Sequence, residues 1–156
     1  MDYTELKRQT AALTEDCPFL IANLSNTAAL IFQSLPEINW AGFYFLRGKE
    51  LILGPFQGKP ACIRIPVGKG VCGTAVSEDK VQRVADVHGF PGHIACDSDS
   101  NSEIVIPLHL GEKIWGVLDI DSPVKERFTE TDSMGLEMVC KEIEKFISMT
   151  SCTTTY

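Results

Sequence analysis

The sequence predicts an α+β fold in which helices near the two ends of the chain pack on one antiparallel β-sheet. Apolar segments joined by short polar turns are typical of β-hairpins, and long helical patterns flank these segments on both sides. A length of 156 residues is ordinary for one domain. We therefore expect a single domain over residues 1–156, with a core that needs no disulfide or structural metal.

The first predicted helix spans residues 18–35 and is amphipathic. Its apolar positions recur at helical spacing: Leu20, Leu24, Ala28, Ile31 and Leu35. Pro36 cannot continue a helix, so we expect the helix to end before it. The apolar runs 38–46 and 51–56 follow, and the polar segment 47–50 between them predicts a hairpin turn.

The middle of the chain contains shorter strands, and a clearer hairpin follows them. Residues 62–66 and 81–87 are short strand-like runs separated by a glycine-rich segment. Residues 103–110 and 113–120 are longer runs, and the Gly-Glu pair between them predicts a turn. The order of elements is therefore helix, hairpin, strand, polar loop region, hairpin and helix.

The last predicted helix spans residues 128–149. Thr129 and Asp132 stand at capping-box spacing at its start. One apolar stripe follows: Leu136, Val139, Cys140, Ile143 and Phe146. The polar residues 150–156 are expected to form a frayed tail.

The composition argues against several classes of function. A net charge of −7 disfavours nucleic-acid binding, which depends on Lys and Arg side chains that neutralise phosphates. The N-terminus lacks the cationic and apolar regions of a secretory signal, and no run of about 18 apolar residues occurs. We expect no membrane association and a cytoplasmic location. The six cysteines should then rest reduced, and any disulfide should be transient and catalytic or redox-sensing.

A glycine-rich motif at residues 68–73 matches G-x-G-x-x-G, and Asp86 lies near the offset of a dinucleotide-binding fingerprint. Only about ten residues separate Gly73 from the next strand, too few for the long crossover helix of a Rossmann unit. Pro66 also stands where the incoming strand would be central. We favour a tight turn that opens a short helix with Cys72 at its N-terminus, a position that lowers the pKa of a thiol.

A zinc site could be assembled from Cys62, Cys72, His93 and Cys96. These residues contain no C-x-x-C pair, which structural zinc sites usually have. The sequence therefore favours no metal, and His93 is expected to be a loop histidine that bonds to the backbone.

The cysteines differ in their surroundings. Cys96 lies in the small-residue loop 92–103, and loops held by a rigid scaffold are where chemistry concentrates. It is either a reactive thiol or a half-buried loop residue. Cys140 lies on the apolar stripe of the last helix, where a free cysteine behaves as a small hydrophobe. We expect Cys17, Cys140 and Cys152 to be structural or incidental.

Glu103, Asp119 and Asp121 form an acidic cluster. If the second hairpin forms, Glu103 and Asp121 lie at its open end, and Asp119 shares a face with Asp121 because strand side chains alternate with period two. Close carboxylates repel unless a cation binds or a proton is shared. The cluster is therefore a binding site for a substrate ammonium or a solvated acidic edge. Trp40 and Tyr44 share a strand face and would line a pocket or the core.

Six stretches, in order along nearly the whole chain, carry a family resemblance. They are residues 39–44 (NWAGFY), 53–58 (LGPFQG), 65–75, 92–97 (GHIACD), 100–104 (SNSEI) and 116–122 (GVLDIDS). They resemble the free methionine-R-sulfoxide reductases. The resemblance implies a GAF fold, with the terminal helices on one face of the sheet and a ligand pocket on the other. It also implies three functional cysteines, here Cys62, Cys72 and Cys96, without dividing the resolving role between Cys62 and Cys72.

The chemistry of sulfoxide reduction assigns further roles. The Cys96 thiolate would attack the sulfoxide sulfur while Glu103 or Asp121 protonates the oxygen. The resulting sulfenic acid would condense with a second thiol, for which Cys62 is our first choice. A thioredoxin-like protein would then reduce the disulfide, so no metal or organic cofactor is required.

The same reasoning explains why the substrate would be a free amino acid. Asp119 and Asp121 would bind its ammonium through charge-assisted bonds, which a peptide-bound residue cannot offer. Trp40 and Tyr44 would wall the methyl end. The alternatives are a non-catalytic GAF module that binds a small ligand or nucleotide, and a redox-switched interaction protein. A homodimer is compatible with the sequence, which does not fix the oligomeric state.

Overall fold

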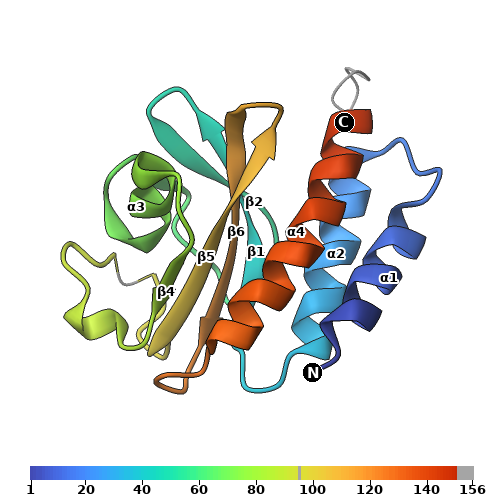
Figure 1. Ribbon diagram of the computed structural model, residues 1–156. Coiled ribbons are helices and arrows are strands. Elements are labelled where there is room, and N and C mark those ends of the chain that lie inside the picture. Colours follow the sequence, from blue (N-terminus) through green and yellow to red (C-terminus); the bar gives the residue numbers. More distant parts are fainter. Residues whose placement is uncertain (95, 151–156) are drawn as a thin grey trace.

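The computed structural model describes residues 1–94 and 96–150 (Figure 1). The helices are α1 (Tyr3–Thr14), α2 (Leu20–Ser34), α3 (Gly70–Glu78) and α4 (Glu130–Thr150), with a short 3-10 turn η1 at Val87–Gly89. The strands are β1 (Trp40–Arg47), β2 (Glu50–Gly58), β3 (Arg64–Pro66), β4 (Gln82–Val84), β5 (Ser102–Leu110) and β6 (Lys113–Ser122). No helix among the described residues is long and apolar enough to cross a membrane.

The strands form one six-stranded sheet in the order β3-β2-β1-β6-β5-β4, and every neighbouring pair is antiparallel. Helices α2 and α4 lie against one face of the sheet and α1 packs on them from the outside, whereas α3 lies on the other face (Figure 1). Both predicted hairpins are present, as β1–β2 and β5–β6. The predicted α+β fold, with terminal helices on one face, is confirmed.

Strand alternation divides the apolar side chains between two clusters. On β1, Phe43 packs into the larger cluster beneath α1, α2 and α4, whereas its neighbour Tyr44 packs into the smaller cluster beneath α3. Both side chains are buried. Every second side chain of β1, counted from Tyr44, therefore faces α3, and this face of the sheet carries the candidate site.

The start of α4 is fixed by the predicted capping box. The Thr129 N–H donates to Asp132 Oδ2 at 2.8 Å, and the Asp132 N–H donates to Thr129 Oγ1 at 3.2 Å. Asp132 also accepts hydrogen bonds from the Tyr3 hydroxyl and from Arg127. The capping carboxylate therefore joins α4 to the first turn of α1.

Helix α1 was not predicted from the sequence. Only Tyr3, Leu6 and Thr10 of this helix are buried, so the apolar pattern is too sparse to indicate a helix. The signal that could have revealed it is the pair Asp2 and Glu5. The Asp2 side chain accepts hydrogen bonds from the backbone N–H groups of Thr4 and Glu5, which satisfies free donors at the start of the helix.

The contact between α1 and α4 leaves no room for a side chain at Gly135. A Cβ there would lie 2.1 Å from Cγ of Tyr3. We expect Gly135→Ala to lower the free energy of unfolding by about 1–3 kcal/mol, although alanine favours the helix, because overpacking displaces the Tyr3 ring. Gly89→Ala is the matched control, since no atom lies within 4 Å of a Cβ there. Urea unfolding of both variants checks the prediction, and equal midpoints would contradict it.

Candidate active site

A pocket with a cavity volume of about 40 Å³ lies on the α3 face of the sheet. Of the eight residues to which the sequence analysis gave a catalytic or substrate-binding role, seven line it: Trp40, Tyr44, Cys72, Cys96, Glu103, Asp119 and Asp121. The eighth, Cys62, reaches the pocket through a disulfide bond to Cys96. His93, from the zinc alternative, lines the pocket as well. The fold therefore gathers the predicted residues at one place.

The strand register explains how the acidic side chains meet. Glu103 on β5 stands directly opposite Asp121 on β6, and Asp121 stands opposite Trp40 on β1. Asp119 lies two residues along β6 and therefore faces the same side of the sheet. On its β1 side Asp119 is opposite Gly42, which has no side chain. The predicted placement of the carboxylates at one end of the hairpin is confirmed.

Burial dominates the electrostatics of this acidic cluster. Loss of water raises the pKa of Glu103 and of Asp121 well above the ordinary range, and the neighbouring Asp119 charge raises both further. Burial also raises the pKa of Asp119 to about 6, although the nearby Cys72 and Glu103 side chains act to lower it. Desolvation, more than the charge of one carboxylate on another, therefore sets the pKa of Glu103 and Asp121.

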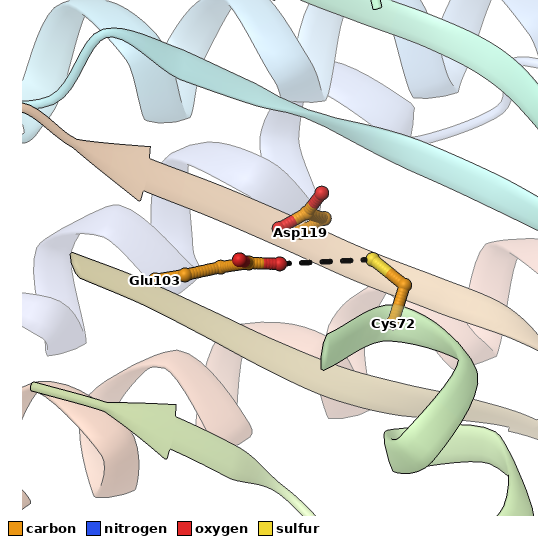
Figure 2. A group of neighbouring side chains, drawn as sticks. All are labelled: Cys72, Glu103 and Asp119. Atoms are coloured by element: carbon orange, nitrogen blue, oxygen red, sulfur yellow. Dashed lines mark hydrogen bonds between the residues drawn. The ribbon is translucent and has the colours of Figure 1, made fainter. Parts of the chain in front are cut away.

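Cys72 is buried and lies beside Glu103 and Asp119 of the acidic cluster (Figure 2). Its Sγ is 3.9 Å from Oε1 of Glu103. Burial raises the pKa of the Cys72 thiol well above its usual value, and the Asp119 and Glu103 charges raise it further. The expectation that the N-terminus of α3 lowers this pKa is therefore wrong, because the loss of water and two nearby carboxylates outweigh the helix end.

Cys62 and Cys96 form a disulfide, with their Cα atoms 5.5 Å apart. Cys62 lies between β2 and β3, and Cys96 lies in the loop before β5. The Tyr44 hydroxyl donates a hydrogen bond to the carbonyl of Cys62 at 2.9 Å. Tyr44 therefore holds the backbone of one cysteine of the pair in addition to lining the pocket.

Polar residues missed by the sequence argument hold the loop that carries Cys96. Asn39 Nδ2 donates to Ser100 Oγ at 3.2 Å and, more weakly, to Asp97 Oδ2 at 3.4 Å. Lys59 forms ion pairs with Asp97 and Asp99. Asp97 and Ser100 also line the pocket. Asn39, Asp97 and Ser100 lie in stretches that carry the family resemblance, but their contacts were not apparent, because the partners come from distant segments.

The glycine-rich motif forms a tight turn that opens a short helix, where a Rossmann unit would have a long crossover helix. Gly70 has a φ of +62°, and a Cβ at Gly73 would lie 2.4 Å from the carbonyl oxygen of Pro66. The helix that follows, α3, has nine residues and leads to the short antiparallel strand β4. The glycines therefore allow α3 to pack closely on the segment that follows β3, as the sequence favoured.

The remaining cysteines lie away from the pocket, and the disulfide affects the zinc alternative. Cys140 is buried in α4 and Cys17 is half-buried, and neither lines the pocket. Cys152 lies outside the described residues. The four-residue zinc set considered from the sequence is not available in this form, because Cys62 and Cys96 are bonded to each other.

The raised pKa of Asp119 predicts a pH-dependent stability. Its folded pKa of about 6 exceeds the ordinary 3.8, so stability present at pH 4 is lost as the pH rises through 6. Asp119→Asn cannot ionise. We therefore compare the free energy of unfolding of Asp119→Asn with that of wild type at each pH. The difference, variant minus wild type, should be larger at pH 7 than at pH 4 by roughly 1–3 kcal/mol, since one pKa unit corresponds to about 1.4 kcal/mol.

Urea unfolding at pH 4 and pH 7 measures this difference. Glu112→Gln is the matched control, because Glu112 is exposed in the β5–β6 turn. A constant difference between Asp119→Asn and wild type at the two pH values would contradict the assignment of a raised pKa to Asp119.

The comparisons with known proteins agree with the geometry. The GAF domain family model matches residues 19–147. The free methionine-R-sulfoxide reductase of Escherichia coli strain K12 is 55% identical over 148 residues, which cover 95% of this chain and 90% of the relative. The extent of these matches leaves little of either chain unaligned.

Two solved structures show the same fold. The fRMsr of Staphylococcus aureus in its reduced form is 59% identical with a TM-score of 0.91, and the match covers 94% of this chain and 95% of that one. The free methionine-R-sulfoxide reductase of Neisseria meningitidis, in complex with its substrate, is 41% identical with a TM-score of 0.93. This match covers 97% of this chain and 92% of that one. This chain therefore belongs to the GAF domain family and, within it, to the free methionine-R-sulfoxide reductases.

Proposed function

We propose that this protein reduces free methionine-(R)-sulfoxide to methionine with its own cysteine thiols. The observation that carries the proposal is the Cys62–Cys96 disulfide, which adjoins a pocket lined by carboxyl and aromatic side chains. A thiol pair supplies two electrons, and the acidic cluster supplies protons and a site for an ammonium group. The relatives named as reductases of this substrate support the same reaction.

The first step needs a nucleophile at sulfur and an acid at oxygen. The Cys96 thiolate attacks the sulfoxide sulfur, and Glu103 or Asp121 protonates the departing oxygen. Burial raises the pKa of both carboxyl groups, which favours the protonated form that a general acid needs. The hydroxyl group then passes to the Cys96 sulfur as the bond between the two sulfur atoms breaks, so methionine leaves and Cys96 becomes a sulfenic acid.

The second step closes the disulfide. The thiol of Cys62 attacks the sulfenic sulfur of Cys96, an S–S bond forms and water leaves. A thioredoxin-like dithiol then restores both thiols by exchange, which fits a protein of the reducing cytoplasm. The buried Cys72 remains the second candidate for the resolving thiol.

Asp119 and Asp121 are our candidates for binding the substrate ammonium. Asp119 Oδ1 is buried and has no hydrogen-bond partner among the described residues. An ammonium placed against it would donate a charge-assisted hydrogen bond and offset the cost of burying the carboxylate. The rings of Trp40 and Tyr44, whose centroids are 5.9 Å apart, form the apolar wall for the methyl end.

The disulfide indicates which redox form can react with substrate. Cys96 is bonded to Cys62 beside the pocket. We infer that the substrate reacts only after the disulfide has been reduced, because a bonded sulfur cannot act as the thiolate nucleophile.

Turnover of free methionine sulfoxide with a dithiol reductant is the direct test. Stoichiometric methionine formation supports the reductase. Binding without turnover would support the alternative, a GAF module that senses a small ligand, and thiol oxidation by peroxide without methionine formation would support a redox-switched interaction protein.

The resolving role of Cys62 gives a prediction of its own. One equivalent of substrate, added to reduced protein without reductant, should consume two thiols and produce the Cys62–Cys96 disulfide. Cys62→Ser should keep the first turnover, while steady-state turnover falls because the sulfenic acid lacks its partner. Peptide mapping and trapping of the sulfenic acid check this, with Cys17→Ser as control. A mapped Cys72–Cys96 disulfide would transfer the role to Cys72.

A further inference from the structure

The side chains of Cys72, Glu103 and Asp119 converge from three different elements. Cys72 is on α3, Glu103 on β5 and Asp119 on β6, and one ligand atom from each lies within 4.8 Å of the others (Figure 2). All three side chains are buried and line the pocket. The proposed reaction uses the carboxylates but gives the thiol of Cys72 no settled part.

We propose that Cys72, Glu103 and Asp119 form a binding site for a thiophilic divalent cation of the Zn²⁺ class. The thiol distinguishes this site from one built for an ammonium group alone, because a thiolate is a soft ligand that favours such metals. The site differs from the zinc set considered from the sequence, since it uses neither His93 nor the disulfide pair.

An unpartnered acceptor points to a cation at this place. Asp119 is 94% buried, and its Oδ1 has no hydrogen-bond partner among the described residues. A buried carboxylate oxygen without a partner is costly, and a bound cation removes the cost. Two further acidic residues, Asp97 and Asp121, line the same pocket.

The spacing suits tetrahedral coordination. Zinc bonds of about 2.3 Å to sulfur and about 2.0 Å to oxygen place the ligand atoms roughly 3.5 Å apart. Cys72 Sγ and Glu103 Oε1 are 3.9 Å apart, so a small closure of the side chains brings them to bonding positions. Water from the pocket would supply the fourth ligand.

Metal binding would displace the proton of the Cys72 thiol to solvent, and with it any proton held by the Glu103 carboxyl group, because only the thiolate and the carboxylate coordinate. The bound ion would occupy the region that the proposed function assigns to the substrate ammonium. The two cations should therefore exclude each other, and Zn²⁺ should inhibit turnover competitively. This competition rests on the proposed function, whereas the metal site itself does not.

The test begins with a Cys62→Ser/Cys96→Ser protein, in which the redox pair cannot bind metal. The protein is freed of metal with a chelator and titrated with Zn²⁺ by calorimetry and with Co²⁺ by absorption. We expect one ion per chain, proton release, and a thiolate-to-cobalt charge-transfer band. Adding Cys72→Ser should remove the band and weaken Zn²⁺ binding at least about tenfold. Adding Asp119→Asn should weaken binding and keep the band.

The control adds Cys140→Ala, which removes a buried thiol outside the pocket and should leave the band and the affinity unchanged. Circular dichroism of each variant shows that a lost signal is not a loss of folding. Absence of binding in the folded starting protein, or equal affinity after Cys72→Ser, would overturn the proposal.

The competition is tested separately in wild type by adding methionine sulfoxide to the reduced, metal-loaded protein. Displacement of the metal supports the shared site, and simultaneous binding overturns it. If the protein proves not to be a reductase, the charge-transfer band still decides the metal site.

Discussion

Replacing Cys96 with serine should reduce turnover of free methionine sulfoxide by on the order of 10³-fold or more, as removal of a catalytic nucleophile does in other enzymes. A serine hydroxyl is almost entirely protonated at neutral pH and is a far poorer nucleophile at sulfur than a thiolate. Cys96 lines the pocket and is the member of the disulfide that lies beside the acidic cluster. The measurement is single-turnover formation of methionine by the reduced protein.

The control for this variant is Cys17→Ser, because Cys17 is half-buried and lies outside the pocket. Cys140→Ser is less suitable, since it would place a hydroxyl group in the hydrophobic core beneath α4. Calorimetry should show that Cys96→Ser still binds substrate, which separates loss of chemistry from loss of binding. Normal turnover by Cys96→Ser would contradict this assignment and indicate that Cys72 is the nucleophile.

Acetylation of the substrate amine should lower kcat/KM by on the order of 10²-fold or more. The acetyl group removes the ammonium and leaves Asp119 and Asp121 buried against an amide. An uncompensated buried charge costs several kcal/mol, about 3–5 when a buried ion pair is broken. Each 1.4 kcal/mol corresponds to about tenfold, so a partial loss already gives this factor.

The matching variant is Asp119→Asn, which should weaken binding of the free amino acid much more than binding of the N-acetyl compound. Losing Glu103 or Asp121 should lower the chemical rate as well, if either protonates the sulfoxide oxygen. Steady-state kinetics of both substrates on wild type, Asp119→Asn and the exposed control Glu112→Gln make the comparison. Equal kcat/KM for the two substrates on wild type would exclude recognition of the ammonium by this cluster.

Local sequence patterns determined the strands and the faces of their side chains. Period-two alternation was sufficient to place Glu103, Asp119 and Asp121 together, because the β5–β6 turn fixes the register of a hairpin. The apolar repeat of α2 and the capping box of α4 are likewise local. Helix α1 escaped this reasoning because its stability comes from packing of Tyr3 and Leu6 on the rest of the fold more than from its own pattern.

The properties of the cysteines were decided by the tertiary structure. Cys62 and Cys96 are 34 residues apart, and only the approach of the β2–β3 connection to the loop before β5 makes them partners. The position of Cys72 near the start of a helix predicted a lowered pKa, but the actual pKa depends on the water and charges around the sulfur. Burial depends on every element that packs around a residue, so a thiol's reactivity cannot be determined from its neighbours in the sequence.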